Sequence, residues 1–165
     1  MEHFYNPVRI TQGVGCLQEL GGLIETLQPS SILVLAYQQE LFEDPVLQQV
    51  RLQHSKINWY LEAVRVSNPD IRDLEALYQT YRKQKPELVI GIGGGSVLDL
   101  AKSLCMVLGE DDLTLETMRE KIAAKAFHQP YCPWLGIPTT FGTGSEVTCW
   151  ATIWERELGC GRSLE

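Results

Sequence analysis

Two short segments of this chain combine glycine with hydroxyl side chains. The first is Gly93-Gly94-Gly95-Ser96, and the second is Thr139-Thr140-Phe141-Gly142-Thr143-Gly144-Ser145. Glycine lets the backbone approach an anion closely, and a helix that begins at such a turn directs free N–H groups and its positive dipole at that anion. The two segments together predict a cleft that binds a nucleotide.

The first segment also has an interpretation that needs no ligand. Ser96 would cap a helix, with Asp99 at the third helical position, and the pair would form a capping box. Asp99 would otherwise point into the cleft and contact the ligand. Lys102 lies one turn further on, and we expect it to pair with a charge on its helix rather than act as a catalytic base.

The second segment could be an ordinary turn rich in serine and threonine. It directly follows an apolar run at residues 133–138, however, and it carries four hydroxyl groups, on Thr139, Thr140, Thr143 and Ser145. Hydroxyls placed at the end of a buried strand favour a binding role.

The surrounding pattern alternates extended and helical segments. We expect extended segments at 4–11, 31–36, 57–66, 88–92, 133–138 and 146–155, and helices at 16–27, from 45, at 70–83 and at 97–108. The fold class is therefore α/β: a single domain with a doubly wound, mainly parallel, Rossmann-like sheet. Both glycine-rich loops then lie at the carboxyl ends of strands, where such folds bind ligands. Residues 109–129 predict only a solvated acidic loop and a helix start.

The composition of the chain indicates its size class, its compartment and the kinds of partner it can bind. A chain of 165 residues with 44% apolar residues can bury the core of one domain. The net charge of −7 disfavours nucleic acid and anionic membranes as partners. Five cysteines without a CxxC pair predict reduced, buried thiols, including Cys105 and Cys149, and a cytoplasmic location. No signal peptide or membrane span is indicated.

The histidines predict no metal site. His3, His54 and His128 are widely separated and have no spacing typical of metal ligands. No GxSxG motif or Cys/His arrangement indicates a catalytic nucleophile either.

The motifs GGGSxxDxAK at 93–102 and PTTxGTGSEVT at 138–148 resemble those of the iron-containing alcohol dehydrogenase family. Asn68-Pro69 is similar to a further step of that family. The resemblance implies a two-domain enzyme that transfers hydride between NAD(P) and an alcohol or aldehyde. Residues 1–165 would be its amino-terminal NAD(P)-binding domain. A helical half that binds a divalent metal, Fe or Zn, would follow Glu165, so we expect neither metal ligands nor catalytic residues in this chain, and no activity from it alone.

The resemblance also implies roles for particular residues. Gly94, Gly95 and Ser96 would hold the cofactor's pyrophosphate, Thr139, Thr140 and Thr143 would line the cofactor, Asp99 would lie near the nicotinamide end, and Asn68 would contribute to the same site. Two departures stand out. Tyr37 replaces an aspartate that many NAD-using members have, which leaves NADP as well as NAD open. A lysine common after the second motif is missing, and only Arg156 and Arg162 lie nearby.

Two other functions remain open. A lyase domain like that of the dehydroquinate synthases has an analogous glycine loop, although the GTGSE sequence at 142–146 argues against it. A nucleotide-binding or interaction module without catalysis is the other. The expected partners are a small alcohol or aldehyde and a second copy of the chain in a homodimer, because an isolated half-enzyme would expose apolar surface.

Overall fold

A computed structural model describes residues 7–164 of the chain. Four strands form its main sheet: β1 (Ser31–Ala36), β2 (Asn58–Ala63), β3 (Leu88–Gly93) and β4 (Trp134–Pro138). The helices are α1 (Leu20–Leu27), α2 (Pro45–Gln53), α3 (Ile71–Tyr81), α4 (Gly95–Val107) and α5 (Leu115–Ala123). Strands β5 (Ala151–Glu155) and β6 (Cys160–Leu164) form a hairpin, and short 3-10 helices occupy Cys16–Glu19, Gln39–Glu43 and Ser145–Val147.

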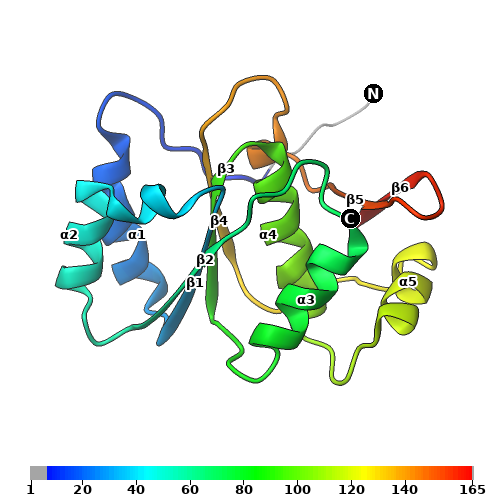
Figure 1. The fold of residues 1–165 in the computed structure, drawn as a ribbon. Helices are drawn as coiled ribbons and strands as arrows, with labels where there is room; N and C mark the ends of the chain where they lie inside the picture. Colours follow the sequence, from blue (N-terminus) through cyan, green and yellow to red (C-terminus); the bar gives the residue numbers. More distant parts are fainter. Residues whose placement is uncertain (1–6, 165) are drawn as a thin grey trace, which may run out of the picture.

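The main sheet is parallel throughout, with strand order β2-β1-β3-β4. Figure 1 shows it nearly edge-on, with α1 and α2 on one side and α3 and α4 on the other. The chain runs outward from β1 to β2 and then returns to β3 on the other side of β1. The strand order therefore reverses between β1 and β3, and in doubly wound sheets the crevice at such a reversal is where ligands bind. The predicted fold class is confirmed.

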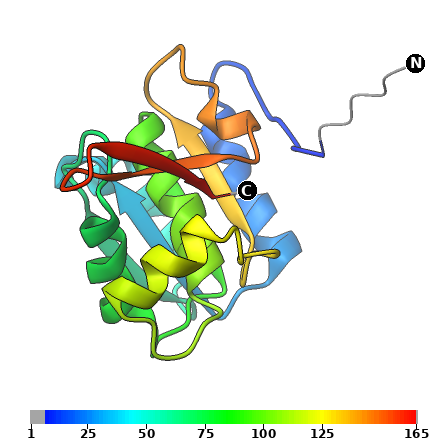
Figure 2. The ribbon, with the colours of Figure 1, turned by 90° about the vertical axis from the view of Figure 1, so that its right-hand side faces the viewer.

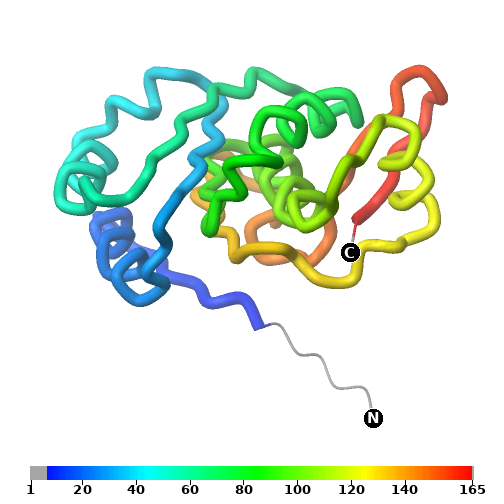
Figure 3. Tube along the Cα trace, turned by 90° about the horizontal axis from the view of Figure 1, so that it is seen from below, coloured from blue at the N-terminus to red at the C-terminus, as the bar shows by residue number. Residues whose placement is uncertain are grey.

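Helices cover both faces of the sheet, as the view along it shows (Figure 3). Alternate residues of β1 serve the two faces: Ile32 and Val34 pack with α1 and α2, whereas Leu33 and Leu35 pack with α3 and α4. All six residues of β1 are buried. This double burial explains the uninterrupted apolar run in the sequence.

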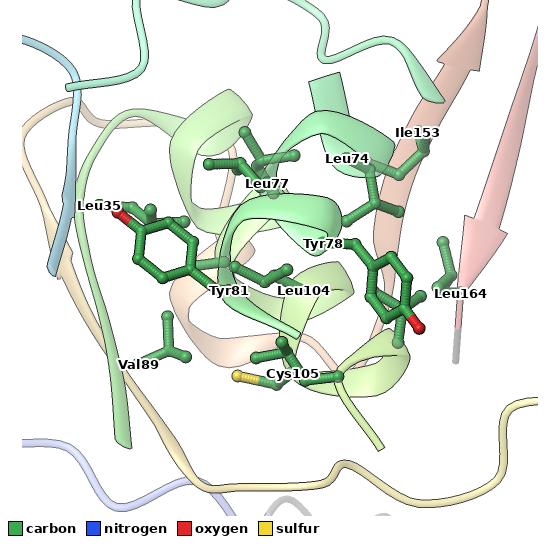
Figure 4. Packing of buried hydrophobic residues seen from close by; sticks show 14 of the residues in the cluster. Leu35, Leu74, Leu77, Tyr78, Tyr81, Val89, Leu104, Cys105, Ile153 and Leu164 are labelled. Atoms are coloured by element: carbon green, nitrogen blue, oxygen red, sulfur yellow. The ribbon is translucent and has the colours of Figure 1, made fainter. Parts of the chain in front are cut away.

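A third layer lies outside α3 and α4, made of α5 and the antiparallel β5–β6 hairpin (Figure 2). Ile153 and Leu164 of the hairpin join the core beside Tyr78 (Figure 4). The Tyr78 hydroxyl donates to the carbonyl of Glu110 (2.9 Å) and accepts from the N–H of Leu113 (3.0 Å). Helix α3 thereby holds the segment that leads into α5.

Most predicted elements are found, with three differences. Residues 7–11 of the expected first extended segment form no strand, and residues 4–6 lie outside the described part of the chain. Within the expected extended segment 146–155, the strand begins only at Ala151, after a 3-10 turn. Helix α5 and strand β6 were not predicted as such.

The cysteines divide by position in the fold. Cys105 on α4 and Cys132 before β4 are buried, and their sulfur atoms lie 3.7 Å apart. Cys149 is exposed, so its predicted burial is wrong; it sits in the loop before β5 rather than in a strand. All five thiols are free. Within residues 7–164, no helix is long and apolar enough to cross a membrane.

Candidate functional site

A groove of about 410 Å³ lies at the amino-terminal end of α4. Three segments line it: the turn before α3, the first turns of α4, and the chain from the second glycine-rich loop into β5. The predicted residues that line it are Asn68, Gly95, Ser96, Asp99 and Thr143. The rest of the lining comes from Pro69, Ser145, Thr148, Trp150, Thr152 and Trp154.

Helix α4 begins earlier than the sequence predicted. Gly94 is its N-cap, and within residues 7–164 no side chain caps it. The N–H of Val97 already donates to the carbonyl of Gly94 over 3.0 Å. The N–H groups of Gly95 and Ser96 precede it in the first turn, where a helix offers no carbonyl partner of its own, and they remain for a ligand at the groove. The capping box of Ser96 and Asp99 is wrong, because the helix starts at Gly95 and Ser96 lies inside its first turn.

Ser96 and Asn68 contact each other at this helix end. The backbone N–H of Asn68 donates to Ser96 Oγ over 3.1 Å. Asn68 has a φ of 53°, in the left-handed region, which asparagine adopts more readily than most residues. The left-handed turn directs the Asn68 N–H at the serine.

The two glycine-rich loops lie against each other. The N–H of Thr139 donates to the carbonyl of Gly93 (3.0 Å). A Cβ on Gly94 would stand 3.0 Å from Thr140 Oγ1, and one on Gly95 would stand 2.8 Å from Thr143 Cγ2. A side chain at either position would therefore crowd the threonines, and Thr143 would have to shift to admit one at Gly95. Gly94, Thr139 and Thr140 lie beside the groove, while Gly95 and Thr143 form part of its lining.

Asp99 binds two residues of the groove lining. Its Oδ1 accepts from the hydroxyl of Ser145 (2.5 Å), and its Oδ2 accepts from the N–H of Thr152 (3.1 Å). Lys102 Nζ lies 3.4 Å from Oδ1, which confirms the expected charge pair on α4. Asp99 thus lines the groove and also fixes two residues of its wall.

Lys102 is buried, with 6% of its surface exposed. Its ammonium donates to the carbonyls of Ser145 (2.9 Å), Thr148 (3.3 Å) and Trp150. Burial lowers the pKa of Lys102, and the nearby carboxylate of Asp99 opposes that shift. The buried ammonium binds three carbonyls spread over residues 145–150, and this explains how a segment with little regular structure keeps its shape.

Tyr37 stands where β1 ends, at the reversal of the strand order. Its N–H donates to the carbonyl of Ile92 on β3 (3.1 Å), and its side chain is exposed. The residue is therefore level with Gly93, beside the start of the first glycine-rich loop.

Of the two candidate arginines after the second motif, one lies at this site. The guanidinium of Arg156 donates to the carbonyl of Asn68 (3.2 Å). Arg162 instead pairs with the buried Glu155 over 2.8 Å. The sequence alone did not distinguish them.

A metal ion finds no ligand set in the described part of the chain. Among residues 7–164, no group of three or more His, Cys, Asp or Glu side chains is placed to hold one. His54 ends α2 and His128 is exposed in the loop before β4, while His3 lies outside the described residues.

The chain is similar to known proteins both in sequence and in structure. Residues 7–164 match the family model described as iron-containing alcohol dehydrogenase. The chain is 29% identical over 158 residues to the choline dehydrogenase of Bacillus subtilis, covering 93% of this chain and 38% of that protein. It is 32% identical over 119 residues to the aldehyde-alcohol dehydrogenase of Streptococcus pneumoniae, covering 68% of this chain and 14% of that one.

The fold also resembles those of solved structures. The sulfoacetaldehyde reductase of Bifidobacterium kashiwanohense, solved in complex with NAD+, superposes with a TM-score of 0.82 and 27% identity, covering 99% of this chain and 43% of that one. An iron-containing alcohol dehydrogenase of Thermotoga maritima gives 0.81 and 28%, covering 98% and 44%. The chain thus spans less than half the length of each of these relatives. Because the family model matches nearly the whole of it, the chain belongs to the iron-containing alcohol dehydrogenase family.

Proposed function

We propose that this chain forms the cofactor-binding part of a metal-dependent oxidoreductase that transfers hydride between NAD(P) and an alcohol or aldehyde. The observation that carries the proposal is the meeting of the two glycine-rich loops at the uncapped start of α4. Family membership and a similar structure solved with NAD+ support it.

Each part of the site has a role in the proposal. The backbone of Gly94 and Gly95 and the hydroxyl of Ser96 bind the pyrophosphate, since free N–H groups at a helix start favour phosphate. The hydroxyls of the second loop, on Thr139, Thr140 and Thr143, line the cofactor. Asp99 lies near the nicotinamide end, and Asn68 completes the wall on the other side of Ser96.

Bound nicotinamide would supply the hydride acceptor or donor. This chain's own contribution is to bind and orient the cofactor. The described residues do not fit a metal site, so the proposal places the iron or zinc, and the alcohol or aldehyde, with the remainder of a longer enzyme. We expect the 165-residue chain alone to show no alcohol oxidation, and turnover dependent on added Fe²⁺ or Zn²⁺ would contradict this.

Titration with NADH and NADPH tests the binding role. Ser96→Asp puts a carboxylate in the first turn of α4, where the dipole favours the fold but the charge repels a pyrophosphate. Ser96→Asn is the matched neutral control. We expect the aspartate variant to raise Kd at least about tenfold over the asparagine variant. Failure of the parent chain to bind either nucleotide at millimolar concentration, or equal binding by the two variants, would overturn the proposal.

We also propose a cytoplasmic location and a homodimer. All five cysteines are free thiols, and exposed apolar side chains such as Phe141 and Trp150 are available for association. Sedimentation of the purified chain across a range of concentrations tests the assembly, and a constant monomer mass would exclude it.

A further inference from the structure

The turn between β2 and α3 lies between an arginine and a serine. Nη2 of Arg156 donates to the carbonyl oxygens of Ser67 (3.1 Å) and Asn68 (3.2 Å). The N–H of Asn68 donates to Ser96 Oγ over 3.1 Å. Arg156 on the hairpin is thereby connected through one turn to the hydroxyl at the start of α4.

The backbone around Arg156 is tied to the same turn. Its own N–H donates to Asp70 Oδ2 (3.0 Å), and the N–H of Trp154 donates to the carbonyl of Pro69 (2.8 Å). Burial alone would raise the pKa of Asp70, but hydrogen bonds from the N–H groups of Arg156 and Arg72, with both positive charges, lower it overall. Asp70 therefore stays ionised and keeps the hairpin beside the turn.

The contact between Asn68 and Ser96 affects where the Ser96 hydroxyl can donate its hydrogen. A serine hydroxyl has one hydrogen to donate and two lone pairs. Because Oγ accepts from Asn68, its hydrogen is directed to another partner, and the groove is where a phosphate oxygen would lie. Two carbonyl oxygens of the same turn would repel that phosphate, and the guanidinium of Arg156 offsets their partial negative charge.

We infer that Arg156 is a positioning residue for the cofactor: it holds the turn at Ser67 and Asn68 so that Ser96 presents its hydroxyl hydrogen to the pyrophosphate. The inference deepens the proposed function and rests on it for the identity of the ligand. Arg156 touches the turn rather than the cofactor.

Arg162 supplies a matched control on the same hairpin. It lies on β6 and its Nε pairs with Glu155 Oε2 over 2.8 Å. Arg162→Gln removes a positive charge from the same hairpin, as Arg156→Gln does, without removing a contact to the turn. An effect that both variants share therefore comes from the lost charge or from a less stable hairpin, and not from the lost contact to the turn.

The first readout needs no ligand. In the 165-residue chain, amide hydrogen exchange at Asn68 should accelerate about tenfold in Arg156→Gln and stay near the parent rate in Arg162→Gln. Equal exchange at Asn68 in the two variants would overturn the inference even if NADH binds. Thermal melts establish that each variant is folded, and if Arg156→Gln is not, Arg156→Lys keeps the charge and should show a smaller acceleration.

The second readout is a double-mutant cycle on the Kd of NADH. Arg156→Gln should raise Kd about tenfold in the parent chain, but less than about twofold in a Ser96→Ala background, because the hydroxyl it positions is already gone. A full effect in both backgrounds would mean that Arg156 acts by direct charge, and would overturn the inference. Absence of NADH binding by the parent chain would overturn the proposed function, while the exchange measurement would still decide the role of Arg156 in the turn.

Discussion

Lys102 carries its charge in a buried position, and the stability of the fold should depend on pH through it. Burial lowers its pKa in the folded state below the ordinary value of 10.5. Between the two pKa values of Lys102 the unfolded chain binds more protons at this group, so Lys102 contributes a rise in the free energy of unfolding with pH. Lys102→Met should remove this rise. Cys105, whose pKa is raised by burial, contributes in the opposite direction and is present in every variant compared.

Urea unfolding at a series of alkaline pH values, up to the ordinary lysine value, measures the difference between the parent and Lys102→Met. The exposed Lys83→Met serves as control, and it should keep the pH slope of the parent chain. An unchanged slope in Lys102→Met would contradict the expectation.

Tyr37 should govern the choice between the two nicotinamide cofactors. It follows β1 and is hydrogen-bonded to β3 beside the first glycine-rich loop. An acid at this position favours the ribose of NAD and repels the 2′-phosphate of NADP. Tyr37→Asp should therefore raise the ratio of the Kd for NADPH to the Kd for NADH by about tenfold or more.

The comparison variant at this position is Tyr37→Asn, which makes a similar change in size without adding charge. Paired titrations of both variants with the two reduced cofactors give the ratio directly. If asparagine shifts the ratio as much as aspartate does, the effect is not electrostatic.

Among the elements, helix α5 shows a clear amino-terminal cap. The Thr114 hydroxyl accepts from the N–H of Thr117 (3.2 Å), and the Thr117 hydroxyl accepts from the N–H of Thr114 (2.9 Å). Thr114→Ala should lower the free energy of unfolding by about 1 kcal/mol. Thr26→Ala, which removes a hydroxyl bonded to the carbonyl four residues earlier in α1, should change it by less than about 0.5 kcal/mol.

The sequence did contain this helix, although it was predicted only as a loop and a helix start. Met118 and Ile122 are buried at a spacing of four residues, but the acids at 110–112 outweighed so short an apolar pattern. Strand β6 has no such pattern. Its segment Cys160–Leu164 is extended because β5 lies beside it, and that pairing depends on tertiary contacts.

The residues of the groove likewise divide into those with a local sequence signal and those placed by tertiary contacts. The glycines and threonines of the two loops were identified because their types and positions after strands have a local meaning. The partners of Asp99 were not, since Ser145 and Thr152 lie far along the chain. Arg156 and Arg162 looked alike in sequence, and only the pairing of the hairpin separates them.

At the scale of the whole molecule, the parallel sheet was predictable because its two central strands, β1 and β3, are buried on both faces. Double burial leaves uninterrupted apolar runs, and the alternating helices then impose crossover connections. The strand order places β3 at the reversal, next to β1, so the loop after β3 lies where this fold binds its ligands. The third layer, with α5 and the hairpin, adds the wall that turns this sheet edge into a groove.

The rates at which the cysteines are alkylated should show how the core of the molecule becomes accessible to solvent. Cys149 is exposed, whereas Cys105 and Cys132 are buried in contact with each other. Burial raises the pKa of Cys105, and alkylation requires an accessible thiolate. With iodoacetamide and peptide mass spectrometry, Cys149 should label at once, and the two core thiols should label at a rate set by global unfolding. Labelling of Cys105 as fast as Cys149 without urea would show that α4 separates from the sheet without global unfolding.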